Sequence, residues 1–364
     1  MKLTLPQQDI YFEQLMHPSA PIYNIGAKIL IEGTIDVVTF NEAYKNLIKQ
    51  HDSYRTIFKK ENEGVTSLVL ENFEGELPLI DFSERENANK EAVAFMQNEF
   101  VKPFDIVSGK FLHNFILIKV TSEKYYLFSV YHHIITDGWG TSLMYQRLVK
   151  NYNELIEKGE VISKYEYSYK NFIIEDGEYQ KSKNYKEDKS YWLKKFSDLP
   201  ENILEKKNQK SEEDKSAQKS IYIERERYNS ISKLAKELKG GTFHVILATL
   251  FLYFGRKHQN NDFGIGIPVL NRGKAVFKRT VGLFMGISPL RMQIDFNSNF
   301  ENLLTEIRNQ LRKDYRHQRF PLGKLIQGLN GFQEKERLFN ITLSYEKQNY
   351  ADHFKGTKTT VIPL

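Results

Sequence analysis

The chain contains no cysteine, which excludes disulfide bonds, thiolate metal sites and a cysteine nucleophile. It has no run of about 18 apolar residues, the length that a membrane-spanning helix requires. Its opening residues, MKLTLPQQDIYFEQL, carry polar and acidic side chains where a secretory signal has its apolar centre. These absences favour a soluble, cytoplasmic protein with no membrane partner.

Several motifs that define other reactions are also missing. The sequence has neither the GxxxxGK(S/T) loop that cradles nucleotide phosphates nor the GxGxxG turn of dinucleotide-binding proteins. Without a GxSxG element, a serine acyl-enzyme is not supported. The 9 histidines show no metal spacing such as HExxH, so we predict no metal.

The net charge of +6 would suit an acidic partner, including a carrier protein or a nucleic acid. The lysines, however, are scattered among glutamates in segments such as KSKNYKEDKSYWLKKF, which is typical of a solvated surface. No nucleic-acid-binding module is recognisable, so we expect no binding to DNA or RNA.

The chain does contain enough apolar material for a folded core, with 40% hydrophobic and 13% aromatic residues. Its 364 residues exceed one usual domain, so we expect two lobes or one large unit. Helical and strand patterns alternate along the sequence, which predicts a layered α/β (α+β) fold.

The hydrophobic periodicity predicts the individual elements. In the first half we expect helices that begin near Thr4, after Asp36 and after Trp139, a strand over 23–32, and an antiparallel hairpin of 113–120 and 125–132. In the second half we expect a helix around 191–196, a surface loop over 201–220, a strand over 220–225, a helix over 243–254, a buried strand over 262–268, a helix over 299–315 and a strand over 338–345. The glycines of 262–268 should allow another backbone to approach closely.

The most informative segment is HHIITDGWG, at the end of the predicted hairpin. It has the form HHxxxDG, with His132 and His133 where a strand ends and Asp137 and Gly138 where a helix begins. An imidazole titrates near neutral pH, and a nearby carboxylate can fix local geometry, as proton removal from an attacking amine or hydroxyl requires. The alternative is that two buried histidines close a hairpin.

Several segments, taken in order, resemble the condensation domains of nonribosomal peptide synthetases, within the superfamily that includes chloramphenicol acetyltransferase. HHIITDGWG resembles the family's HHxxxDG signature, and LTLPQQDIYF resembles its opening helix. HDSYRTIF, VGLFMGISPLR, RHQRFPLGKL and LFNITLSYE resemble its HExLRTxF, (I/V)GxFVNTxxxR, HQxYPFxxL and LFxVxxSYQ segments. Their shared order over nearly the whole chain makes the resemblance specific.

The sequence departs from the family pattern at several positions. Gly286 and Ile287 replace an Asn-Thr pair, so any hydrogen bond from that asparagine is absent. Asp52 and Tyr54 replace a glutamate and a leucine, and Gly140 stands where a serine is usual.

The resemblance implies two chloramphenicol acetyltransferase-like lobes in a V with a central tunnel, here residues 1–176 and 177–364. Family members continue for several elements beyond LFNITLSYE, so we expect the C-terminal lobe, which stops at Leu364, to be truncated. The tunnel would receive the 4'-phosphopantetheine arms of donor and acceptor carrier proteins. These carriers and adjacent synthetase domains are the implied partners; we expect a monomer with no tightly bound cofactor.

The implied reaction is amide (peptide) bond formation, an acyltransferase-type condensation of a donor acyl or peptidyl thioester with an acceptor aminoacyl thioester. Side chains alternate along an extended segment, so only one histidine can readily face the tunnel. The resemblance assigns that place to His133 and leaves His132 to packing. Removal of a proton by His133 and mere orientation of the amine both stay open.

Asp137 is either part of a catalytic dyad or, as we favour, the structural partner of an arginine, because a buried carboxylate needs compensation. Arg55 and Arg291 are the candidates for that partner, and the sequence does not choose between them. Gly138 suits a tight turn, and its N–H near a helix start also suits a developing oxyanion. Trp139 is expected to form a wall of the site.

Two other interpretations of the function remain open. A related acyltransferase would use acyl-CoA and an alcohol or a small amine, whereas an inactive module would only recruit carrier proteins or tailoring enzymes. The cyclization branch has an aspartate in place of His132, and the epimerization branch has Val-Ser-Trp where this chain has Trp139-Gly140. The donor, the acceptor, the donor chirality and the initiating or elongating subtype are not determined by the sequence.

Overall fold

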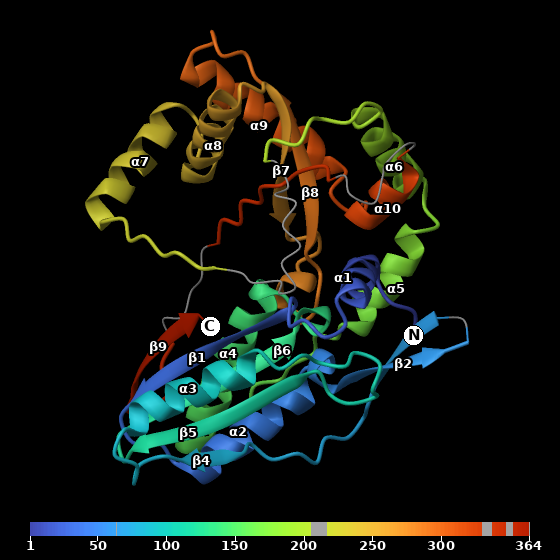
Figure 1. Ribbon diagram of the computed structural model, residues 1–364. Coiled ribbons are helices and arrows are strands. Elements are labelled where there is room, and N and C mark those ends of the chain that lie inside the picture. Colours follow the sequence, from blue (N-terminus) through green and yellow to red (C-terminus); the bar gives the residue numbers. More distant parts are fainter. Residues whose placement is uncertain (63, 205–216, 330–336, 347–351, 364) are drawn as a thin grey trace. The chain divides into compact units, whose positions relative to one another are not determined.

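The computed structural model describes residues 1–62, 64–204, 217–329, 337–346 and 352–363 (Figure 1). The chain divides into two compact units. The first unit comprises Met1–Ser182, Asn271–Met285 and Lys347–Leu364, and the second comprises Lys183–Leu270 and Gly286–Glu346. Two segments from the second half of the chain, 271–285 and 347–364, therefore belong to the first unit, which also contains the HHxxxDG motif.

A five-stranded sheet forms the centre of the first unit (Figure 1). Its strand order is β4 (Leu79–Asp81), β5 (His113–Thr121), β6 (Lys124–His132), β1 (Asn24–Glu32) and β9 (Lys358–Pro363). β4 runs parallel to β5, and the other neighbours are antiparallel. The structure confirms both the strand predicted over 23–32 and the predicted hairpin.

Helices cover both faces of this sheet. α2 (Val37–Gln50) and α4 (Gly138–Lys158) share one core with the side chains of Ile29, Leu117 and Leu127. α3 (Ala88–Phe100) packs on the other face, because successive side chains of a strand point in opposite directions and Ile116, Ile118 and Phe128 therefore face away from α2 and α4.

The ends of these helices follow the predicted signals. Asp36 caps α2 by accepting a hydrogen bond of 2.6 Å from the Thr39 N–H. Gly159 ends α4 with a φ of 76°, a left-handed conformation that glycine adopts without steric cost. α1 (Leu5–Met16) starts at Thr4, which forms a capping box with Gln7.

The first unit also contains shorter elements. They are η1 (Asp52–Arg55), the hairpin of β2 (Thr56–Glu61) and β3 (Gly64–Val69), η2 (His133–Ile135), α5 (Lys170–Tyr179) and η3 (Phe277–Arg279).

The second unit is built on the antiparallel pair β7 (Asp262–Val269) and β8 (Gly286–Gln293). Its helices are α6 (Lys183–Lys195), α7 (Arg225–Glu237), α8 (Thr242–His258), α9 (Phe300–Arg316) and α10 (Leu322–Gly328). The glycines of β7 allow close approach as predicted, since a Cβ on Gly264 would lie 2.5 Å from the Leu338 carbonyl oxygen.

Two predicted strands of this unit are wrong or reduced. The strand predicted over 220–225 is absent: Tyr222 is 93% exposed, and α7 already begins at Arg225. Apolar residues form a strand only where a neighbour satisfies their backbone groups, and this segment has no paired strand among the described residues. The strand predicted over 338–345 is reduced to one bridge between Thr342 and Gly266. Most of the loop predicted over 201–220 lies outside the described residues.

Within the described residues, no single helix has both the length and the apolar content needed to cross a membrane. Only α7 and α8 taken together pass that test, and the chain bends by 91° between them. Side chains of α8, including Leu247 and Phe251, are buried in the core of the second unit.

Candidate functional site

His132 is the last residue of β6, and its imidazole is buried among protein groups. Its Nδ1 accepts a hydrogen bond of 3.1 Å from the Ile134 N–H, and its Nε2 lies 3.2 Å from Oε1 of Gln14. Burial, together with the nearby His133, lowers the pKa of His132 to about 3. The ring is therefore neutral near pH 7, and both of its nitrogens are occupied.

His133 has left the sheet and opens the turn η2, so the two histidines do not alternate along one strand as the parity argument assumed. Its N–H donates to the Tyr23 carbonyl at 2.8 Å, and its carbonyl accepts from the Thr136 N–H at 3.2 Å. The half-buried ring stands edge-on to Tyr23, and its enclosed Nδ1 has no hydrogen-bond partner among the described residues. Hydrogen bonds hold the backbone of His133, whereas its ring makes no hydrogen bond to the residues that the structure describes.

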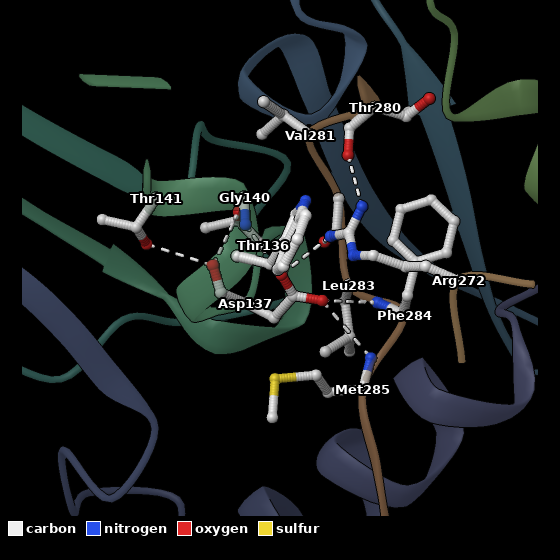
Figure 2. Close-up of polar contacts among 12 residues, drawn as sticks. Thr136, Asp137, Gly140, Thr141, Arg272, Thr280, Val281, Leu283, Phe284 and Met285 are labelled. Carbon is white, nitrogen blue, oxygen red and sulfur yellow. Dashed lines mark hydrogen bonds and ion pairs between the residues drawn. The ribbon is translucent and has the colours of Figure 1, made fainter. Parts of the chain in front are cut away.

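Asp137 is the N-cap of α4, and its carboxylate is fully buried. Oδ1 accepts from the Gly140 N–H and from Arg272, each at 2.8 Å. Oδ2 accepts from the N–H groups of Phe284 and Met285 at 3.0 and 3.3 Å (Figure 2). Because protein donors fill the positions around both oxygens, this carboxylate is poorly placed to contact a substrate.

Arg272 is the partner of Asp137, so the prediction that Arg55 or Arg291 fills this place is wrong. Its guanidinium also donates to the carbonyls of Phe277, Thr280 and Gly282 and lies over the Phe284 ring, 4.0 Å from the ring centroid. Figure 2 shows this side chain reaching from the 271–285 segment to the start of α4. An arginine suits this position, because its planar guanidinium carries several N–H groups that can donate to carbonyls and to a carboxylate at the same time.

The two predicted arginines have other partners. Arg55 binds Asp52, 3.1 Å away, and donates to the carbonyl of Ile48. Arg291 lies in the second unit, where it binds Asp262 at 2.6 Å and Asp198 at 2.8 Å. Arg55 lies three residues from Asp52, and Arg291 lies on the strand that pairs with the strand of Asp262. These nearby aspartates, and not Asp137, are the ion-pair partners of the two arginines.

Little in the sequence pointed to Arg272. It lies in the polar stretch Asn271-Arg272-Gly273, which resembles an ordinary surface turn, and it pairs with an aspartate 135 positions away. In the structure Asn271, directly before the arginine, has a φ of 50°, a conformation that asparagine adopts more readily than most residues.

The start of α4 carries the remaining motif residues. Gly138 is the first helical residue and is half-buried, with an ordinary negative φ. Trp139 is 39% exposed, and its indole N–H donates to the Lys278 carbonyl at 2.9 Å. Gly140 fits because a Cβ there would lie 2.2 Å from Oγ1 of Thr136. The serine of the family pattern would meet the same contact at this position.

No group of three histidine, aspartate or glutamate side chains that could hold a metal ion occurs in the described part of the chain. The prediction of a metal-free site stays a prediction.

A family model described as the condensation domain matches residues 1–361. The chain therefore belongs to the condensation domain family, as its motifs predicted. Similar proteins include the dimodular nonribosomal peptide synthase of Bacillus subtilis (strain 168), 26% identical over 358 residues. Surfactin synthase subunit 1 of the same organism is 25% identical over 355 residues. These matches cover 98% and 95% of this chain but only 15% and 10% of those proteins.

Solved structures show the same fold. The starter condensation domain of rhizomide synthetase RzmA, an arginine-to-alanine mutant in complex with C8-CoA, matches with a TM-score of 0.87 and 24% identity. The match covers 100% of this chain and 82% of that one. The first condensation domain of the calcium-dependent antibiotic synthetase, in complex with substrate analogue 2a, has a TM-score of 0.84 and 20% identity, over 100% of this chain and 84% of that one. These matches confirm the predicted mixed α/β, chloramphenicol acetyltransferase-like fold.

Proposed function

We propose that this chain forms an amide bond between a donor acyl or peptidyl thioester and an acceptor aminoacyl thioester. Each substrate would be carried on the 4'-phosphopantetheine arm of a carrier protein, within a nonribosomal peptide synthetase. The observation that carries this proposal is the contrast within the motif: the ring nitrogens of His132 are both occupied, whereas the ring of His133 makes no hydrogen bond within the described protein. Adjacent synthetase domains and a division into lobes at residue 176 belong to the same proposal, as does a monomeric state.

The reaction balances without a covalent enzyme intermediate. The acceptor nitrogen attacks the donor carbonyl carbon, the new C–N bond forms, and the C–S bond breaks to release the donor thiol. An aminoacyl ammonium must lose one proton to become nucleophilic and a second as the amide forms; one of these reprotonates the leaving thiolate. A positioned base contributes about 10²–10⁴-fold to such steps, and holding both substrates in line contributes at least as much.

His133 is the residue that we assign to the acceptor amine. As a base, it would take the proton on a ring nitrogen; as an orienting group, it would accept a hydrogen bond from the amine. The His133→Gln variant separates these roles, because an amide oxygen can accept a hydrogen bond but cannot remove a proton at pH 7.

The backbone N–H of Gly138 is our candidate for the developing oxyanion. It belongs to the first turn of α4, where N–H groups lack intrahelical partners. Asp137 satisfies the N–H of Gly140 instead, which leaves that of Gly138 for a ligand. Trp139 would form part of the wall beside it.

C8-CoA and Leu-SNAC are suitable first probes, because a solved starter condensation domain of rhizomide synthetase RzmA, another mutant, contains both. Incubation of the chain with both compounds should yield C8-acylated leucine thioester, detected by mass spectrometry. Carrier proteins loaded with other acyl and aminoacyl groups extend the panel. If no donor and acceptor pair gives product above the His133→Ala control, the proposal fails.

Acyl-CoA is the source of the donor in our second candidate function. The C8-CoA in the solved relative favours it, and CoA ends in the same pantetheine arm as a carrier protein. A donor that reacts equally well from CoA and from a carrier would support a free acyl-CoA acyltransferase. An inactive recruitment module would bind loaded carriers but release no product.

A further inference from the structure

Two buried glutamines of α1 face the turn that carries His133. Gln7 donates from Nε2 to the Ile134 carbonyl at 3.1 Å, and its Oε1 accepts from the Thr4 N–H at 3.1 Å. Gln14 lies two helical turns later, hence on the same face of the helix, and contacts His132. Both side chains are almost fully buried, so their hydrogen bonds are not exchanged for water.

The amide of Gln14 has only one sensible orientation. Its Nε2 donates to the carbonyls of His17 and Ala20 at 2.6 and 3.0 Å. The opposite orientation would point the amide oxygen at two carbonyl oxygens, which repel it. Oε1 of Gln14 is therefore the atom that faces the His132 ring, and it can only accept a hydrogen bond.

This orientation sets the position of the proton on His132. An acceptor opposite Nε2 requires that Nε2 carry the proton, so the neutral ring has an unprotonated Nδ1. An unprotonated Nδ1 is what the Ile134 N–H needs as its acceptor. Hydrogen-bond donation thus runs in one direction, from the Ile134 N–H through His132 and Gln14 to the carbonyls of His17 and Ala20.

We propose that Gln14 is a positioning residue for His133, which it holds by fixing the tautomer of His132. The amide N–H of Ile134, which His132 accepts, belongs to the peptide bond between His133 and Ile134. The carbonyl of Ile134 accepts a hydrogen bond from Gln7. With the Tyr23 and Thr136 contacts of His133, every backbone polar group of His133 and Ile134 then has a fixed partner. The inference rests on the proposed role of His133 in the reaction.

The test replaces the amide with an apolar side chain of similar length. Gln14→Met leaves Nε2 of His132 without an acceptor, so the Nε2-protonated tautomer loses its support. We expect the ¹⁵N spectrum of labelled histidine to show the Nε2–H form of His132 in the native chain and a mixture of tautomers, with shifted His133 signals, in the variant. With C8-CoA and Leu-SNAC, kcat should fall roughly 10- to 100-fold with little change in KM.

Gln8→Met is the matched control, because it makes the same chemical change on the same helix. The Gln8 amide donates to the Leu3 carbonyl at 3.0 Å and does not contact the histidine turn. We expect this variant to keep the native tautomer and the native kcat. Thermal melting of both variants shows whether either change acts through general loss of stability.

A second variant, Gln14→Glu, tests the inference through the pH profile of kcat, which should not change if Gln14 only packs against its neighbours. A carboxylate beside Nε2 favours the charged ring, and an imidazolium cannot accept the Ile134 N–H because Nδ1 is then protonated. The ionisable side chains next to this ring are His133, whose charge opposes one on His132, and Tyr23, whose pKa is raised by burial and by Glu13. The pH profile of kcat should gain an acid limb, with activity recovering as the pH rises.

Three outcomes decide the matter. A tautomer shift in Gln14→Met, with the kcat loss and the new acid limb, supports the inference. A native His132 protonated on Nδ1, or a Gln14→Met variant with unchanged spectra and kcat, overturns it. If the native chain is inactive on every substrate, the proposed function fails, and the His132 and His133 spectra alone then decide whether Gln14 holds the turn.

Discussion

Asp137 and Arg272 form an ion pair of 2.8 Å whose side chains are 0% and 1% exposed. The pair ties the start of α4, with the histidine motif, to the 271–285 segment. Two charges removed from water remain stable only if hydrogen bonds satisfy their remaining donors and acceptors. Both side chains meet much of this requirement, Asp137 with backbone N–H groups and Arg272 with backbone carbonyls.

Asp137→Asn should destabilise the chain as well as reduce activity. Either orientation of the amide turns an NH₂ group toward N–H donors, and Arg272 loses its counter-charge. We expect a loss of about 3–5 kcal/mol in the free energy of unfolding, measured by urea titration. Asp81→Asn is the control, because its ion pair with Lys119 is exposed and should contribute less than about 1 kcal/mol. Unchanged stability with activity lost would indicate a direct catalytic role for Asp137.

Arg272→Lys should also be destabilising, although the charge is kept. An ammonium group cannot reach the Asp137 carboxylate and the carbonyls of Phe277, Thr280 and Gly282 at once. A double-mutant cycle with Asp137→Asn and Arg272→Met measures the coupling directly by urea unfolding. We expect the double variant to lose less than the sum of the single losses, by about 1–3 kcal/mol. Additive losses would show that the two side chains act independently.

The sequence predicted the elements around the site better than the contacts within it. Periodicity and caps located β1, the β5–β6 hairpin and α4, because each depends on neighbours within a few residues. The Asp137–Arg272 pair joins positions 135 residues apart, and no periodic pattern encodes such a contact. The cost of burying a carboxylate predicted that Asp137 has an arginine partner. Which arginine fills that place depends on how the segment 271–285 packs, and the sequence does not reveal this packing.

The missed and misplaced strands have the same cause. The segment 220–225 has strand-forming side chains, yet Ile221 and Tyr222 are exposed at 80% and 93% and no described strand pairs with them. Conversely, β9 was not predicted, and it pairs with β1 from the far end of the chain. Strand formation depends on partners as well as composition, and a single sequence reveals composition more directly.

Gly140 should tolerate a side chain only when Thr136 is made smaller. A Cβ on residue 140 would lie 2.2 Å from Oγ1 of Thr136, so Gly140→Ala should cost about 1–3 kcal/mol of stability. The double variant Gly140→Ala/Thr136→Ala removes the clash and should recover most of that loss. Thermal melting of the three variants checks this expectation. If the second substitution gives no recovery, the glycine is required for another reason.

Acid should destabilise this fold through its buried neutral histidines. Burial lowers the pKa of His51 and His132 to about 3 and that of His113 to about 4, against 6.5 for an ordinary histidine. Below pH 6.5 the unfolded chain therefore binds protons that the folded chain does not. Stability is fully present above that pH and falls as the pH drops toward 4, by about 1.4 kcal/mol per pH unit for each histidine.

His51 offers the cleanest test of this dependence, because neither of its ring nitrogens has a hydrogen-bond partner among the described residues. His51→Leu should therefore keep much of the packing while removing one titrating group. Urea unfolding at pH 7, 6 and 5 should show that the free energy of unfolding falls less steeply with pH in this variant. The difference should approach the contribution of one histidine, about 1.4 kcal/mol per pH unit. His258→Gln, at an exposed position, controls for removal of a histidine. An identical pH dependence in His51→Leu and the native chain would mean that His51 is not held neutral in the folded protein.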